Sequence, residues 1–206
     1  MAGGRVAAGP ARLAAAVAVF LCLGAGQARA DWLITPFIGG SFAPETTFLV
    51  FEEGAGRKFA FGGSVALLSD GLFGLEAEFS HIPRFFEGDY VLGLVLTSRV
   101  TTLGGNVIVA APLSLTRESL RPYLVGGVGL LQARSKNAGG LFPVDADLLG
   151  VTLGAGAIGM VSERSGVRFD LRHIKAASGA DGPLARPGLS RLSFWRATLG
   201  VVFRLL

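Results

Sequence analysis

The stretch from Leu72 to Ile82 constrains the fold of this chain more than any other part of the sequence. Its apolar residues alternate one by one with small or charged residues, in the order Phe73, Gly74, Leu75, Glu76, Ala77, Glu78, Phe79 and Ser80. Because successive side chains of a strand point to opposite faces, this pattern predicts a strand with one apolar face and one face that carries two carboxylates. The strand alone does not decide whether its apolar face meets a protein core or lipid.

The first thirty residues have the composition of a secretory signal peptide. Leu13 to Ala25 is a run without charge, and Ala28-Arg29-Ala30 places alanine at the two positions that a signal peptidase reads. We predict a signal peptide over residues 1–30 and export by the general secretory route. The apolar run is shorter than the ~20 residues of a transmembrane helix. The single cysteine, Cys22, lies in this run, so the mature chain can form no disulfide or thiolate metal site.

The mature chain is close to neutral. Removal of Arg5, Arg12 and Arg29 changes the balance from 19 basic and 15 acidic residues to 16 and 15. The sequence has no basic stripe interleaved with aromatic residues, so we predict no nucleic-acid partner. The remaining 176 of the 206 residues suffice for one domain, which we place at 31–206.

The mature chain is apolar, yet its uncharged stretches are too short for membrane helices. Leu148 to Ser162 is among the longest, and four glycines interrupt it. A helix needs ~18 to 20 apolar residues to cross hydrocarbon, whereas a strand of a closed barrel needs only ~9 to 11. A barrel is therefore the fold that would allow this chain to enter a membrane.

Eight segments have the pattern of strands. They are residues 32–42, 58–68, 72–82, 99–110, 120–134, 148–161, 166–176 and 191–205. Short or moderate connections follow the even strands, at 69–71, 111–119 and 162–165, and longer loops follow the odd strands, at 43–57, 83–98, 135–147 and 177–190. Short turns at one end and long loops at the other are typical of outer-membrane barrels. We predict an all-β fold, an eight-stranded antiparallel up-and-down transmembrane β-barrel.

Most of these strands have one apolar and one polar face, but the fifth and sixth are apolar on both faces and cannot be oriented from the sequence. In a soluble barrel the charged faces meet water and the apolar faces fill the interior, whereas a membrane barrel has the opposite arrangement. Aromatic residues near the turn-side ends of five strands favour the membrane arrangement, because they would form an interfacial girdle. These residues are Trp32, Phe73, Tyr123, Phe169 and Phe203.

Charged residues on the predicted inward faces should meet across the lumen. The glutamates of the third strand and the charged residues of the seventh lie at similar distances from the turns, and Arg196 is expected beside Asp170. The lumen of an eight-stranded barrel is just wide enough for side chains, and an unpaired charge there would be costly. We interpret this candidate site as a structural plug rather than a conducting or gating element. Its residues are Glu76, Glu78, Asn106, Arg168, Asp170, Arg172 and Arg196.

Two histidines are the residues most suggestive of catalysis. His81 follows Ser80, and His173 lies three residues after Asp170. A hydrolase needs its base within hydrogen-bond reach of the nucleophile. The alternation of side chains along each strand instead places the histidines on the outward face and Ser80 and Asp170 on the inward face. The sequence has no metal cluster and no phosphate-binding loop. We therefore predict no enzymatic activity, no cofactor and no metal.

Three segments resemble bacterial outer-membrane β-barrel domains of the OmpA/OmpX/OmpW-like type. They are Trp32 to Gly40 (WLITPFIGG), Arg121 to Gly129 (RPYLVGGVG) and Phe194 to Leu205 (FWRATLGVVFRL). The resemblance implies a location in the outer membrane of a diderm bacterium, with membrane lipid and the barrel-assembly machinery as partners. It is compatible with a structural or surface-interaction role, in which the loops contact an extracellular ligand. The alternative function is a narrow passage for small or apolar molecules, and a lipid A-modifying enzyme is a third hypothesis.

Overall fold

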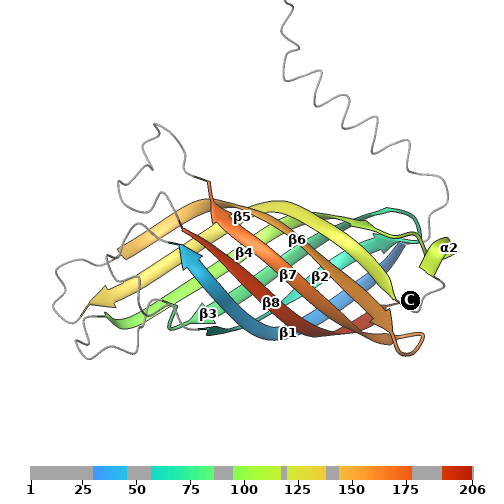
Figure 1. The fold of residues 1–206 in the computed structure, drawn as a ribbon, viewed down its shortest axis with the longest axis horizontal. Coiled ribbons are helices and arrows are strands. Elements are labelled where there is room, and N and C mark those ends of the chain that lie inside the picture. Colours follow the sequence, from blue (N-terminus) through green and yellow to red (C-terminus); the bar gives the residue numbers. More distant parts are fainter. Residues whose placement is uncertain are drawn as a thin grey trace, which may run out of the picture.

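The computed structural model describes residues 30–45, 57–85, 95–116, 120–137, 144–177 and 192–205. These residues form eight strands and one short helix (Figure 1). The strands are β1 Ala30–Glu45, β2 Lys58–Ser69, β3 Phe73–Pro83, β4 Val95–Ala110, β5 Arg121–Asn137, β6 Val144–Met160, β7 Ser165–Ala176 and β8 Ser193–Leu205, and the helix is α2 Leu113–Thr116. The predicted signal peptide at 1–30 lies almost entirely outside the described residues.

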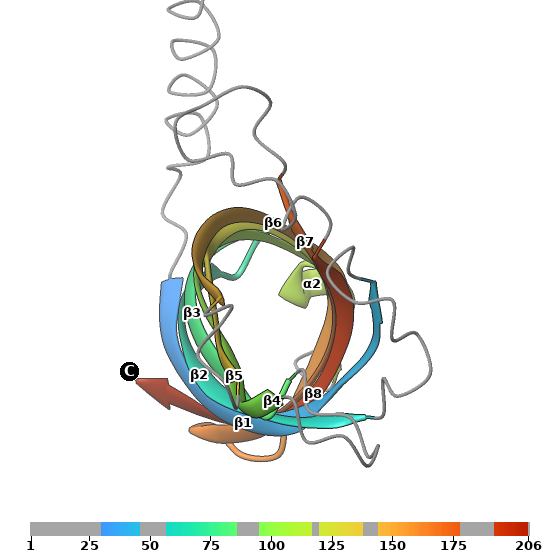
Figure 2. The same cartoon turned by 90° about the vertical axis from the view of Figure 1, so that its left-hand side faces the viewer.

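The strands form a closed barrel in which each strand pairs with its neighbours in the sequence. All pairs are antiparallel, and β1 closes the sheet against β8, for example through Ile38 opposite Leu199. Figure 2 looks along the barrel and shows the continuous wall. The predicted eight-stranded antiparallel up-and-down barrel is confirmed.

The barrel has a turn end and a loop end. The turn end carries the connections 70–72, 111–120 and 161–164, and it lies beside α2 and the C-terminus on the right of Figure 1. We did not predict the helix α2. Arg121 ties two of these connections together, because its guanidinium donates hydrogen bonds to the carbonyl oxygens of Ala111 and Ser69, each at 2.7 Å.

The strands reach further toward the loop end than predicted. β1 continues to Glu45, β4 begins at Val95, β5 continues to Asn137 and β6 begins at Val144. The predicted loops 43–57, 83–98 and 135–147 were therefore too long, because residues at their ends belong to the strands of the wall. Polar residues at these strand ends interrupt the alternation, but backbone pairing does not depend on side-chain polarity. Arg57, Arg84, Phe85 and Ala177 are described outside the strands, and the rest of the four predicted loops lies outside the described residues.

Side chains alternate between the two faces of the wall as predicted. In β3, Phe73, Leu75 and Phe79 are exposed, while Glu76 and Glu78 are buried in the lumen. The structure also orients the two strands that the sequence left open. The outward residues include Leu124, Val128 and Leu130 of β5 and Leu149, Val151 and Leu153 of β6. These strands have two apolar faces because their inner residues also pack in apolar clusters.

The lumen is filled in three layers. The turn-side apolar cluster consists of Leu33, Ala66, Leu68, Ile108, Ala110, Tyr123, Val125, Ile158 and Val202. The loop-side apolar cluster consists of Ala60, Ile82, Phe85, Val100, Leu131, Ala133, Ile174, Ala176, Leu192 and Phe194. The charged side chains lie between the two clusters, so the middle layer is the most polar part of the interior.

One member of the predicted aromatic girdle, Tyr123, was included only for its position near the turn end, on a strand that could not be oriented, and it does not belong to the girdle. Trp32, Phe73, Phe169 and Phe203 are exposed on the outside near the turn end, with 46 to 53% of their surface accessible, but Tyr123 points into the lumen and is 4% exposed. The parity of β5 could not be determined from its sequence, which explains this error. Among the described helical residues, no helix is long and apolar enough to span a bilayer.

Candidate functional site

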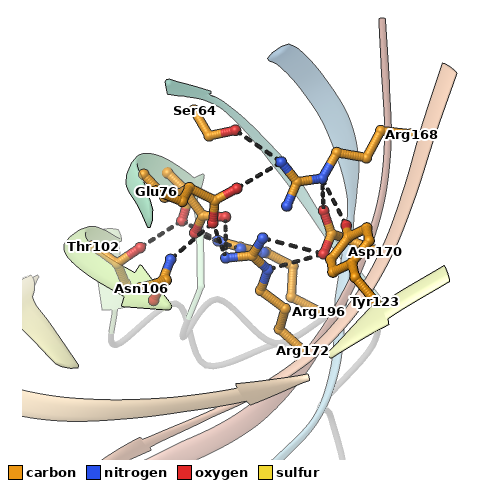
Figure 3. Close-up of polar contacts among 11 residues, drawn as sticks. Ser64, Glu76, Thr102, Asn106, Tyr123, Arg168, Asp170, Arg172 and Arg196 are labelled. Atoms are coloured by element: carbon orange, nitrogen blue, oxygen red, sulfur yellow. Dashed lines mark hydrogen bonds and ion pairs between the residues drawn. The ribbon is translucent and has the colours of Figure 1, made fainter. Parts of the chain in front are cut away.

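The candidate site is the interior network, which we define as Glu76, Glu78, Asn106, Arg168, Asp170, Arg172 and Arg196. The alternation of β3, β4, β7 and β8 turns all seven side chains inward, and each is at most 8% exposed. Figure 3 labels six of them, all but Glu78, and shows these six pointing toward one another. The structure thus brings together all seven residues that the sequence selected.

Glu76 lies at the centre of the interior network. Its Oε2 is 2.6 Å from Nη1 of Arg168, and its Oε1 is 2.8 Å from Nη1 of Arg172. The side-chain amide of Asn106, from the neighbouring strand, donates a hydrogen bond to the same Oε1 at 2.9 Å. Two strands on one side of the barrel are thereby connected to β7 on the other.

Glu78 binds two arginines from two different strands. Its Oε1 is 2.6 Å from Nη2 of Arg196, and its Oε2 is 2.8 Å from Nη1 of Arg172. Arg196 was expected beside Asp170, but the register places Thr198 opposite Asp170 and Arg196 opposite Arg172. The expected neighbour was therefore wrong by two residues, and Arg196 instead reaches across the lumen to Glu78.

Asp170 completes the charge balance. It pairs with Arg168 at 2.7 Å and with Arg172 at 3.1 Å, both on its own strand. The interior network therefore contains three arginines and three carboxylates. Burial of ions is costly, and an ion pair offsets that cost only when its geometry is good and its remaining polar atoms are hydrogen-bonded. Removal of one charge would leave its partner uncompensated in a place that water does not reach.

Several polar residues extend the interior network beyond the set that the sequence selected. The hydroxyl of Tyr123 accepts a hydrogen bond from Nε of Arg168 at 2.6 Å. The Ser80 hydroxyl contacts that of Thr102 at 2.6 Å and accepts a hydrogen bond from Arg196. The inward parity of Ser80 and Thr102 was visible in the sequence, but no pattern in β5 indicated that Tyr123 faces the lumen.

The two histidines lie on the outer face of the wall, away from the interior network. The ring of His81 contacts Thr101 Oγ1 at 2.9 Å, and that of His173 lies 4.9 Å from the ring of Trp195. Ser80, the adjacent candidate nucleophile, points into the lumen. Within the described ranges, no group of three or more histidine, cysteine or acidic residues could hold a metal ion.

An eight-stranded barrel with charges inside and apolar side chains outside has the architecture of the small outer-membrane β-barrels. No protein-family model matches the sequence, and the search of curated proteins found no match. Solved structures do match. Neisserial surface protein A is 11% identical with a TM-score of 0.61, and the match covers 85% of this chain and 97% of that one.

Two further outer-membrane proteins have the same fold. The N-terminal β-barrel domain of OprF from Pseudomonas aeruginosa is 17% identical with a TM-score of 0.53, and the match covers 87% of this chain and 100% of that one. Ail of Yersinia pestis, in complex with the heparin analogue sucrose octasulfate, is 12% identical with a TM-score of 0.52, and the match covers 86% and 99%. The chain therefore has the fold of the small outer-membrane β-barrels.

Proposed function

We propose that this chain is an integral outer-membrane protein, a closed barrel with a structural or surface-interaction role. The observation that carries the proposal is the inversion of polarity between its two faces. Large apolar side chains such as Ile38, Leu103 and Leu153 are 57 to 68% exposed on the outside, while the interior network is buried. A monomer in water rarely exposes continuous apolar surface of this kind, whereas lipid requires it.

A soluble barrel would need the opposite arrangement. Lipocalin-like barrels fill their interior with apolar residues or a ligand and expose polar residues. Here the middle of the lumen holds six charged side chains that neutralise one another. The closed wall also satisfies the backbone groups within the sheet, which a membrane without water demands.

The layered lumen favours a plug over a passage. A conducting path would have to cross the interior network and both apolar clusters, one toward each end of the barrel. Hydrophobic constrictions exclude water and ions, and paired charges leave little field to attract them. The outward position of His81 and His173 likewise gives no support to a lipid A-modifying activity. The function we infer is non-enzymatic and depends on the surface and on the loops.

Fractionation and gel mobility test the membrane location. The mature protein should be recovered with outer membranes, and its unheated form should run faster on a denaturing gel than its boiled form, because an intact barrel stays compact. Recovery as a soluble periplasmic protein would contradict the proposal.

Conductance in planar bilayers tests the closed lumen. We expect the reconstituted wild-type protein to give no stepwise current under conditions in which a general porin conducts. Reproducible unitary steps from the wild-type protein would contradict the plug and favour the alternative, a narrow passage for small molecules. Insertion of the silent protein is checked by its faster mobility on an unheated gel.

A further inference from the structure

The pairing of β1 with β8, which we call the seam, is interrupted in the middle of the wall. The two strands are paired up to Ile34 and again from Phe37, but between these described strands the ladder has no pair at Thr35 or Pro36. On its other side, β1 pairs with β2 through both residues. A proline has no backbone N–H, so the nitrogen of Pro36 faces β8. The carbonyl group of Val201, opposite Pro36 in this register, therefore loses its ladder partner.

A carbonyl group without a partner is costly at this position. Pro36 and Val201 are both exposed on the outer face, among apolar neighbours such as Ile38 and Leu199. Where this face meets hydrocarbon, no water can reach the seam from outside, and every backbone group has to be satisfied from within the barrel. A partner for the Val201 carbonyl group is therefore expected from the side of the lumen.

Two side chains that face the lumen beside the seam also have polar atoms without a partner. Thr35 is 1% exposed, and its Oγ1 has no hydrogen-bond partner among the described residues. Nη2 of Arg168, a side chain that is 2% exposed, has none within the same ranges. Figure 3 shows this third nitrogen of the guanidinium apart from the two that make contacts. Buried polar atoms are nearly always hydrogen-bonded, so these two indicate a ligand.

The contacts of Arg168 place its guanidinium group across the seam. Arg168 is directly opposite Gly200 of β8, which has no side chain. Its Nη1 donates a hydrogen bond to the hydroxyl of Ser64 on β2 at 3.3 Å, and Ser64 is directly opposite Thr35. A Cβ atom on Gly200 would lie only 2.7 Å from Cγ2 of Thr35, so the Thr35 side chain also packs against the seam. The three groups without a partner thus lie along one side of the lumen.

We propose that an ordered water molecule is bound there, held by Thr35, Arg168 and the carbonyl group of Val201. A water molecule can accept a hydrogen bond from Nη2 of Arg168, donate one to the carbonyl group and share one with the Thr35 hydroxyl. Three hydrogen bonds are typical of a buried water. The water closes the seam where Pro36 cannot. The proposal rests on the proposed function, because only lipid excludes solvent from the outer side of the seam.

The donors and acceptors favour water over an anion. A chloride ion could bind the guanidinium group of Arg168, but it has no hydrogen to donate to a carbonyl oxygen. It would also add a negative charge to an interior network in which three arginines already pair with three carboxylates. An uncompensated buried charge is costly, whereas a neutral molecule preserves the balance.

The direct test is the nuclear Overhauser effect between water and threonine methyl groups in the mature chain, refolded in detergent micelles. Thr102 is the matched control, because it also faces the lumen but its hydroxyl already contacts that of Ser80 at 2.6 Å. We expect a cross-peak with the sign of a long-lived bound water at Thr35 and none at Thr102. Absence of the Thr35 cross-peak, or equal cross-peaks at both residues, would overturn the proposal.

Thr35→Val gives an independent test by urea unfolding in lipid vesicles. Valine has nearly the shape of threonine but no hydroxyl. If the hydroxyl binds the water, the equilibrium constant for unfolding should rise about fivefold, the equivalent of one hydrogen bond of ~1 kcal/mol. A variant as stable as the wild type, or more stable, would overturn the proposal, because removal of a buried hydroxyl without a partner does not destabilise a protein.

Two further measurements identify the ligand and its partners. Pro36→Ala supplies the missing N–H to the Val201 carbonyl group, so the effect of Thr35→Val should largely disappear in that background. An effect of unchanged size would overturn the proposal. A wild-type stability that rises with chloride at constant ionic strength would overturn it in favour of an anion. Failure of the wild type to refold in micelles and vesicles would instead contradict the proposed function, since all other outcomes concern a folded barrel.

Discussion

Removal of the carboxylate of Glu78 is the sharpest perturbation of the interior network. Its oxygens lie 2.6 Å from Arg196 and 2.8 Å from Arg172, and each of the two arginines is 1% exposed. Glu78→Gln preserves the shape of the side chain but leaves three buried arginines against two buried carboxylates. Loss of one partner of a buried ion pair typically costs ~3 to 5 kcal/mol, so we expect a decrease of this size in the free energy of unfolding.

A second substitution should recover much of that loss. Glu78→Gln/Arg196→Met restores the charge balance, and we expect a coupling free energy of about 2 to 3 kcal/mol between the two sites. Glu78→Gln/Arg172→Met should recover less, because Arg172 also pairs with two other carboxylates. The control cycle uses Asp31→Asn and Arg204→Met, a partly exposed pair at the turn end for which we expect a coupling of ~0 to 1 kcal/mol.

Urea unfolding in lipid vesicles, followed by tryptophan fluorescence, measures these free energies. Trp32 and Trp195 are both exposed on the outer face, opposite to the substituted side chains, so the fluorescence signal itself should be preserved. If the effects of Glu78→Gln and Arg196→Met add to within ~0.5 kcal/mol, the two groups do not interact and the account of the interior network is refuted.

Five further variants test the facing and packing of the wall by the same unfolding measurement. Val128→Arg, in the middle of the outer face of β5, should lower the free energy of unfolding by ~2 to 4 kcal/mol. Leu124→Arg, nearer the turn end, should lower it by ~0 to 1 kcal/mol, and equal losses would contradict the heights assigned to these residues. Tyr123→Phe removes a hydroxyl that accepts a hydrogen bond from a buried arginine and should cost ~1.5 to 3 kcal/mol, whereas an unchanged stability would place Tyr123 outside the interior network. Gly127→Ala should lower the free energy of unfolding by ~1 to 3 kcal/mol, because the added methyl group would collide with backbone atoms of β4. The methyl group added by Gly105→Ala would meet open space, so this variant should be nearly as stable as the wild type. The reverse order of stabilities would contradict the orientation of these strands.

The fold could be predicted because two independent signals in the sequence agree. The alternation in β3, β7 and β8 identifies strands and their faces, and the short connections identify one end of the barrel. The interior network followed from parity alone, since Glu76 and Arg168 had to face inward once the apolar face was assigned to the outside. Parity does not require knowledge of the register.

The details that were wrong depend on information that a local pattern does not contain. The position of Arg196 opposite Arg172 is set by the register of β7 with β8, and the long connection between these strands does not fix it. The inward position of Tyr123 could not be predicted because both faces of β5 are apolar. The loop-end bounds, such as the start of β4 at Val95, depend on pairing between backbones rather than on side-chain polarity.

Quenching by brominated lipid tests most directly the claim that the outer face of this barrel meets hydrocarbon. The chain has two tryptophans, and Trp32 and Trp195 are 51% and 39% exposed on that face, one toward each end of the barrel. In vesicles of phosphatidylcholine brominated on its acyl chains, we expect a strong loss of tryptophan fluorescence relative to unbrominated vesicles, and little quenching by aqueous iodide. Equal fluorescence in the two kinds of vesicle, together with strong quenching by iodide, would show that this face is in water and would contradict the account.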